Sequence, residues 1–176
     1  AARDEKKLPQ KLPYIVVVID DHVPRPDEDS GSVRTFGLLT TLRTLGWSVI
    51  FVPDNRYHGD VWGERLREAG IEVFTGPEPL EGFLASLSRR VTAVVGARVT
   101  VAWPYLGLVR RRLPGVPCLF DTVDRHSLRE AREAQLTGDV SQAQRAEATK
   151  RLELGFVTAA YATLVELLWD HYGDRR

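Results

Sequence analysis

An uninterrupted apolar run near the start of the chain, Ile15 to Ile19, limits the fold more than any other feature. The run has no polar alternation, so a strand built from it buries both of its faces, as in a parallel sheet covered by helices on both sides. Asp20 and Asp21 end the run, and a polar loop then leads to Gly31. Because ligands bind beyond the carboxyl ends of such strands, this segment predicts an α/β protein with a ligand site at that edge.

Apolar strands and amphipathic helices alternate along the chain, with Gly and Pro between them. The short connections predict right-handed crossovers and a Rossmann-like, doubly wound, mainly parallel sheet flanked by helices. After the first strand, further strands are expected at 48–52, 71–74, 93–95, 117–120 and 162–165. Helices are expected at about 30–45, 60–69, 80–87, 104–113, 127–136, 140–161 and 167–172.

Several helix ends carry recognisable signals. Ser30 or Ser32 can cap the first helix with its hydroxyl, and Pro104 is a favourable first-turn residue for a later one. The letters SLRE, starting at Ser127, match a capping box. The first helix is expected to bury one apolar stripe, formed by Val33, Phe36, Leu39, Leu42 and Leu45.

Length and composition limit the class of protein. The 176 residues suit one domain, residues 14–176, after a charged, flexible lead-in at 1–13. Basic and acidic side chains balance at 24 each, which argues against a dedicated nucleic-acid binder. No apolar stretch is long enough to span a membrane and no secretory signal appears, so we expect a cytoplasmic protein. Cys118 is the single cysteine and is expected to be a small buried core residue.

The acidic pair Asp20 and Asp21, followed by His22, has two interpretations. The letters VVVIDDH resemble the start of a response-regulator receiver, but a receiver also needs an acceptor aspartate on its third strand and a lysine on its fifth. The expected third strand ends without an aspartate, and no lysine lies between Lys11 and Lys150, so we reject that interpretation. In the other interpretation, the two carboxylates only orient the loop through hydrogen bonds.

Three further segments should meet at the same edge of the sheet. Gly31 lies where a helix N-terminus can approach a ligand, although a Gly beside serines is also an ordinary cap. Arg98 follows the fourth strand, as a ligand-binding cation or as a surface salt bridge. The letters DTVDRH, from Asp121 to His126, follow the fifth strand. Convergence of several polar loops on one rim favours a functional site over ordinary polar loops.

Neither a metal site nor a serine nucleophile is marked in the sequence. The four histidines are scattered without a ligand spacing such as HExxH, and GxSxG does not occur. We therefore expect no bound metal and no tightly bound cofactor.

Motifs in order along the chain resemble a known family. PRPDEDSGSVR, FGLLTTLRTLGWSVIFVPDN, the GAR after the fourth strand and FDTVDRHSLREAREAQLTGD are similar to the N-terminal half of bacterial GT-B fold glycosyltransferases, in the group that includes the family 4 retaining enzymes. The similarity covers about residues 14–172. The chain departs from the family pattern after its last strand, where only Glu166 of the usual serine and glutamate remains.

The resemblance implies the acceptor-side domain of an enzyme that moves a sugar from a nucleotide-sugar donor to a carbohydrate or lipid acceptor. A C-terminal domain that this chain lacks would bind the donor, so the chain alone is expected to be inactive or nearly so. Peripheral contact with the inner face of the membrane would fit a lipid acceptor. The alternative is a non-catalytic Rossmann-like module that pairs with another subunit; the oligomeric state is left open.

The resemblance also assigns roles to single residues. Gly31 and Ser32 match the loop that faces the donor diphosphate, and Arg98 matches a rim position that touches sugar. Asp124 and His126 match rim positions and are the candidate catalytic residues. Asp121 is a further candidate substrate-binding residue.

Overall fold

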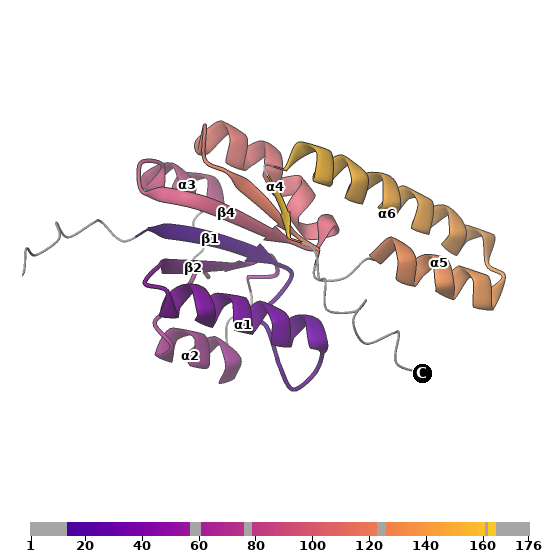
Figure 1. The fold of residues 1–176 in the computed structure, drawn as a ribbon, viewed down its shortest axis with the longest axis horizontal. Coiled ribbons are helices and arrows are strands. Elements are labelled where there is room, and N and C mark those ends of the chain that lie inside the picture. Colours follow the sequence, from indigo (N-terminus) through magenta and orange to yellow (C-terminus); the bar gives the residue numbers. More distant parts are fainter. Residues whose placement is uncertain (1–13, 57–60, 76–78, 123–125, 161, 165–176) are drawn as a thin grey trace, which may run out of the picture.

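A parallel six-stranded sheet in the order β3-β2-β1-β4-β5-β6 forms the centre of the molecule (Figure 1). The computed structural model describes residues 14–56, 61–75, 79–122, 126–160 and 162–164. The strands are β1 (Ile15–Asp20), β2 (Ser48–Pro53), β3 (Glu72–Val73), β4 (Val91–Ala97), β5 (Cys118–Asp121) and β6 (Ala162–Leu164). The expected lead-in at 1–13 and the expected helix at 167–172 lie outside the described residues.

Helices cover both faces of the sheet (Figure 1). They are α1 (Ser30–Thr44), α2 (Val61–Glu68), α3 (Leu80–Leu87), α4 (Val99–Arg112), α5 (His126–Thr137) and α6 (Val140–Ala159). Helices α1 and α2 pack on one face, and α3, α4 and α6 pack on the other. This arrangement confirms the predicted Rossmann-like, doubly wound fold. Its strand order also differs from the 2-1-3-4-5 order of receiver domains, which supports the rejection of that alternative.

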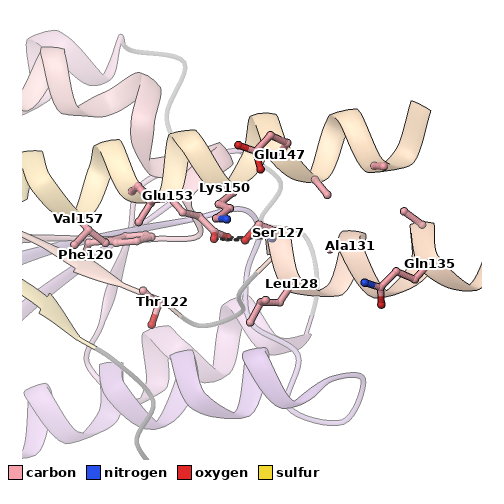
Figure 2. A pocket seen from close by; sticks show the side chains of 14 residues that line it. Phe120, Thr122, Ser127, Leu128, Ala131, Gln135, Glu147, Lys150, Glu153 and Val157 are labelled. Atoms are coloured by element: carbon pink, nitrogen blue, oxygen red, sulfur yellow. Dashed lines mark hydrogen bonds between the residues drawn. The ribbon is translucent and has the colours of Figure 1, made fainter. Parts of the chain in front are cut away.

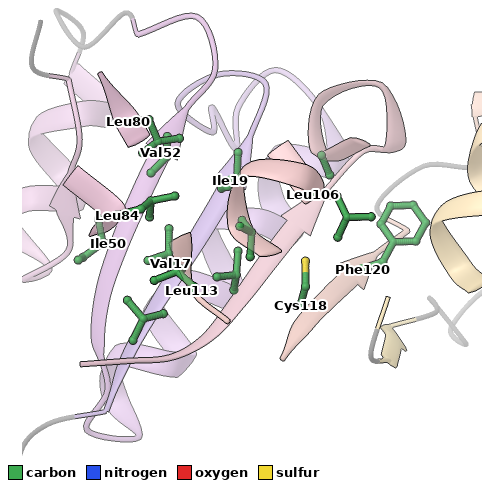
Figure 3. Packing of buried hydrophobic residues seen from close by; sticks show 14 of the residues in the cluster. Val17, Ile19, Ile50, Val52, Leu80, Leu84, Leu106, Leu113, Cys118 and Phe120 are labelled. Carbon is green, nitrogen blue, oxygen red and sulfur yellow. The ribbon is translucent and has the colours of Figure 1, made fainter. Parts of the chain in front are cut away.

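The apolar run of β1 faces two separate cores. Val17 and Ile19 belong to the core beneath α3, α4 and α6, part of which is drawn in Figure 3. Val16 and Val18 belong to the core beneath α1 and α2. All four side chains are essentially inaccessible, as the absence of polar alternation predicted. Cys118 is buried in the first of these cores, also as predicted.

The predicted core stripe of α1 is partly wrong. Leu39 is fully buried and Phe36 and Leu42 pack against the core, but Val33 and Leu45 are 53% and 69% exposed. The other buried positions of α1 are polar, Ser32 and Thr35. The first turns of α1 lie against the charged carboxyl edge of the sheet rather than against the apolar core, so a polar inner face is favoured there.

Two predicted helix starts are also corrected. Helix α4 begins at Val99, five residues before Pro104, so this proline lies inside the helix rather than at its start. Ser127 does not form a capping box, because its amide and hydroxyl both donate to Glu153 of α6, at 3.2 and 2.6 Å. That contact fastens the start of α5 to α6, whereas a capping box would have been local to α5.

Helices α5 and α6 form a hairpin that projects beyond the sheet (Figure 1). Gly138 turns the chain between them with a φ of +69°, a conformation that glycine adopts at little cost. Asp139 then caps α6 by accepting the amide of Ser141 at 2.7 Å. The predicted break at TGD is confirmed. Among the described residues, no helix combines the length and the apolar character that crossing a membrane requires.

Gly96 lets α4 approach β4 very closely. A Cβ placed on Gly96 would lie 2.6 Å from the Cβ of Ala102. We expect Gly96→Ala to lower the free energy of unfolding by roughly 1–3 kcal/mol, because the core must shift to admit the methyl group. Urea unfolding measures the change.

Gly37→Ala is the matched control. Gly37 lies inside α1 with no atom near the position of an added Cβ, so alanine should raise helix stability by about 1 kcal/mol. Equal effects of the two substitutions would contradict the close packing at Gly96.

Candidate functional site

The carboxyl ends of β1 and β4 form the topological switch point of the sheet. From β1 the chain continues to β2 and β3 on one side, whereas β4 is followed by β5 and β6 on the other. In open α/β sheets, the loops that leave such a point in opposite directions leave a crevice that binds ligands. The residues that end β1 and follow β4, Asp20 and Arg98, therefore occupy the position where a ligand is expected.

Asp20 and Arg98 form a buried ion pair at this point. The carboxylate of Asp20 is 3% exposed and accepts a hydrogen bond from Nε of Arg98 at 2.9 Å. Its second oxygen accepts from the hydroxyl of Thr35 at 3.0 Å, and its first also accepts from the amide of Asp21 at 2.8 Å. Asp20 is thus a positioning group, and Arg98 is not part of a surface salt bridge.

The outer part of the Arg98 guanidinium remains available for a ligand. Across the described ranges of the chain, the Arg98 side chain donates only through Nε, to Asp20. Nη1 and Nη2 therefore keep their donors, and the side chain is 14% exposed. A guanidinium held in this way presents a fixed pair of donors that matches an oxyanion.

The backbone of Arg98 is strained. Its φ of +59° and ψ of 115° lie in a region that residues with a Cβ rarely adopt. Arg98 also occupies the N-cap of α4, and its carbonyl accepts the amides of Val101 and Ala102. We infer that the ion pair with Asp20 helps to hold this conformation, since it ties the side chain to β1 while the backbone starts α4.

A second buried pair joins β5 to α1. The carboxylate of Asp121 is 2% exposed and accepts two hydrogen bonds from Arg34, one from Nη2 at 2.7 Å and one from Nε at 3.2 Å. Asp121 was predicted to bind substrate directly, whereas in the structure its carboxylate faces Arg34. Arg34 is 27% exposed and was not singled out in the sequence, although it ends the PRPDEDSGSVR motif.

The N-terminus of α1 is capped by Asp29 rather than by Ser30 or Ser32. Oδ1 of Asp29 accepts the amide of Ser32 at 2.8 Å, and Oδ2 accepts its hydroxyl at 2.7 Å. Ser32 is fully buried, so both of its donors are already bound within the protein. The amides of Ser30 and Gly31 donate no hydrogen bond to any of the described residues.

Asp29 keeps a negative charge at this helix end. Burial raises its pKa, but the hydrogen bonds from Ser32 and the positive charges of Arg98 and His22 bring the pKa below its ordinary value. The carboxylate therefore satisfies the positive end of the helix dipole. An incoming diphosphate would meet this charge, whereas sugar hydroxyls could donate hydrogen bonds to it.

The candidate catalytic residues are only partly described. Asp124 lies outside the described residues. His126 is the first residue of α5 and is partly buried; its Nδ1 lies 3.0 Å from Nη2 of Arg129. Because an arginine can only donate, this contact assigns Nδ1 as the acceptor and places the imidazole proton on Nε2.

One pair near the rim had no signal in the sequence. The hydroxyl of Tyr105 on α4 donates to the carboxylate of Asp54, which follows β2. Burial and the Asp54 charge together raise the pKa of Tyr105 to about 12. The two residues lie 51 positions apart, so only the fold brings them together.

The chemistry available at this edge is that of guanidinium, carboxylate and imidazole groups. Among the described residues, no three His, Cys, Asp or Glu side chains are grouped as metal ligands. Compared with known proteins, the chain matches no protein-family model, and no curated protein matches it.

We expect Asp20→Asn to lower the free energy of unfolding by roughly 3 kcal/mol, because Arg98 would remain mostly buried without a charged partner. Asp21→Asn is the matched control, since its carboxylate is 50% exposed and, within the described part of the chain, contacts only the neighbouring His22 ring. Urea denaturation of both variants measures the difference. Similar stabilities would show that the buried pair does not support the fold.

We expect the free energy of unfolding to fall as the pH rises from 10 towards 12, because Tyr105 has a raised pKa in the folded protein. The unfolded tyrosine ionises near its ordinary pKa of 10, whereas the folded one keeps its proton up to about 12. Its contribution is therefore fully present below pH 10. Tyr105→Phe should flatten the fall, as measured by urea unfolding across this range. Asp54→Asn should lower the pKa of Tyr105, and phenolate absorbance should then appear at lower pH; an unchanged titration would contradict the assignment.

Proposed function

We propose that this chain is the acceptor-side domain of a GT-B type glycosyltransferase, which acts together with a donor-binding domain on a nucleotide sugar. The observation that carries the proposal is the position of Arg98. It lies at the switch point of a doubly wound sheet, is fixed by Asp20, and keeps its two Nη groups available. Binding at this point would place a ligand between this domain and whatever faces its carboxyl edge.

The chemistry of sugar transfer suits this arrangement. A nucleotide sugar loses a diphosphate, so negative charge develops on the leaving oxygens. A guanidinium that is already oriented stabilises that charge without reorganising during the reaction. Asp20 supplies the orientation, since its buried carboxylate accepts from Nε of Arg98 and from neither Nη group. Arg98 would therefore contact the leaving group, and Asp20 would act through it as a positioning residue.

The N-terminus of α1 suits a different part of the substrates. Ser32 is committed to Asp29, and Asp29 is ionised at neutral pH. The carboxylate of Asp29 and the amide of Gly31 therefore favour sugar hydroxyls, which both donate and accept, over a diphosphate. We therefore propose that the diphosphate contacts Arg98 rather than Gly31 and Ser32. The acceptor sugar would lie beside the N-terminus of α1.

His126 is the proposed general base that receives the proton of the acceptor hydroxyl, and Asp124 is the second candidate catalytic residue. A histidine acts as a general base when it lies within hydrogen-bond reach of the hydroxyl. In the described geometry Nδ1 of His126 accepts from Arg129, so Arg129 must move away before this atom can take a proton. Arg129 is exposed, so such a movement would not disturb the core.

A non-catalytic interaction module is the second candidate. The observation that favours it is the apolar surface of the projecting hairpin, where Leu136, Val140 and Leu154 are 88%, 71% and 57% exposed. Large exposed apolar side chains are common at protein–protein contacts. This candidate predicts self-association or pairing with another subunit, and it needs neither Arg98 nor His126.

The decisive experiment measures sugar transfer by the natural polypeptide that carries this domain, with a panel of nucleotide sugars and acceptors. We expect Arg98→Gln to lower kcat by roughly 10²- to 10³-fold, as for the loss of one oriented donor to a developing anion. His126→Gln should lower kcat and alter its pH profile. Arg132→Gln, an exposed arginine of α5, is the matched control and should leave turnover unchanged.

Thermal unfolding of each variant separates lost activity from lost folding. A polypeptide that neither transfers sugar nor binds any nucleotide sugar would contradict the proposal, and so would full activity of both the Arg98 and His126 variants.

A further inference from the structure

His22 follows β1 at the switch point of the sheet, and the chemistry proposed above gives it no role. The chain is anchored on both sides of it. The carbonyl of Asp21 accepts the amide of Asn55, which follows β2, at 3.1 Å. Val23 is 2% exposed and belongs to the core beneath α1 and α2. The His22 ring is therefore carried by a fixed segment of the carboxyl edge.

A hydrogen bond to Asp21 sets the tautomer of His22. Nδ1 of His22 lies 3.2 Å from Oδ2 of Asp21, and a carboxylate can only accept. This contact assigns the proton to Nδ1 and leaves Nε2 as a hydrogen-bond acceptor. No other group within the described ranges forms a hydrogen bond with the ring, and the side chain is 30% exposed. Nε2 is therefore able to accept a hydrogen bond from a ligand.

Asp29 brings further acceptor atoms to the same region. Burial raises its pKa, whereas the Ser32 hydrogen bonds and then the charges of Arg98 and of protonated His22 lower it, so both side chains lie within electrostatic range of this carboxylate. Each Asp29 oxygen accepts one hydrogen bond from Ser32 and can accept a second. With the amide of Gly31, the surface beside α1 offers two acceptor groups and a backbone donor.

Such a set of groups suits two neighbouring hydroxyls. One hydroxyl can donate to Nε2 of His22 and the other to the carboxylate of Asp29, while a hydroxyl oxygen accepts from a backbone amide. A single hydroxyl would satisfy only one of the two acceptor groups. The arrangement therefore favours a ligand with adjacent hydroxyls over a simple alcohol.

We propose that His22, oriented by Asp21, binds the acceptor substrate together with Asp29, and that this substrate presents two neighbouring hydroxyl groups to them. The role of His22 rests on the proposed transferase function and adds the residue that selects the acceptor. His22 contacts the substrate through Nε2. Asp21 acts through His22 and is a positioning residue.

Kinetics of the natural polypeptide that carries this domain test the proposal, with methyl glucopyranoside, mannopyranoside and galactopyranoside and their single-deoxy analogues as acceptors. His22→Leu should raise the acceptor KM roughly three- to tenfold, as for the loss of one hydrogen bond, with kcat little changed. Removing the hydroxyl that His22 binds should weaken the unmodified protein equally and have no further effect in His22→Leu. An unchanged KM in His22→Leu, or additive losses for every deoxy analogue, would overturn the proposal.

Two substitutions test the hydrogen-bonding role itself. His22→Gln carries an amide oxygen that can accept in place of Nε2, so it should recover most of the lost affinity. Asp21→Asn can donate to Nδ1, which moves the ring proton to Nε2 and should raise the acceptor KM. The ¹⁵N chemical shifts of the His22 ring report this change of tautomer. Asp27→Asn, an exposed acid of the same loop, is the matched control and should alter neither KM nor tautomer. A His22 ring protonated at Nε2 in the unmodified protein would overturn the proposal.

The cavity between α5 and α6, of about 700 Å³, is the competing place for a sugar (Figure 2). Thr122, Ser127 and Glu153 line it, whereas His22 and Asp29 do not. Ala143→Phe fills this cavity and should leave the acceptor KM unchanged. A raised KM in Ala143→Phe but not in His22→Leu would place the acceptor in the cavity and overturn the proposal.

Direct binding separates the role of His22 from the transferase function. Titration of the histidine-labelled chain with the same methyl glycosides should shift the Nε2 resonance of His22 saturably, whether or not sugar is transferred. Sugar transfer without any shift at His22 would leave the proposed function standing and overturn the role of His22. A saturable shift without sugar transfer would support acceptor binding at His22 and contradict the proposed function.

Discussion

The buried ion pair of Asp20 and Arg98 joins the two halves of the sheet at the point where the chain changes direction. A buried carboxylate requires partners, and Asp20 receives them from the residue after β1, from α1 and from the start of α4. One residue thus connects the strand, the helix on one face and the helix on the other. Arg98, whose backbone is strained, is at once the partner of Asp20 and the N-cap of α4.

The same pair links structure to the proposed chemistry. Asp20 is too buried to meet a ligand, but it orients an arginine that can. Asp121 at the end of β5 forms a similar buried ion pair with Arg34 of α1. Two of the acidic residues at the strand ends thus form buried ion pairs with arginines. Of these two arginines, Arg98 keeps both Nη groups without a hydrogen-bond partner among the described residues, so its remaining donors point in a fixed direction.

The hairpin of α5 and α6 is attached to the rest of the domain by only a few of its side chains. It is held to the body of the protein by Phe156, which packs on Phe120 and faces Gly96, and by the contact of Ser127 with Glu153. Most of its remaining length projects from the sheet, so small residues between the helices leave a cavity instead of a filled core. The body of the domain is built around two apolar cores, whereas several apolar side chains of the hairpin remain exposed.

The sequence alone determined the sheet, because an unbroken apolar run such as Ile15 to Ile19 can be buried only between two layers of helices. It also determined that Gly31, Arg98 and Asp121 follow strands at one edge. Which side chain meets which was decided by tertiary structure. Asp29 rather than a serine caps α1, Thr35 turns inward towards Asp20, and Asp121 faces Arg34 from 87 residues away. Periodicity cannot predict such pairs, because burying a charge forces a choice of partner that only the folded arrangement makes available.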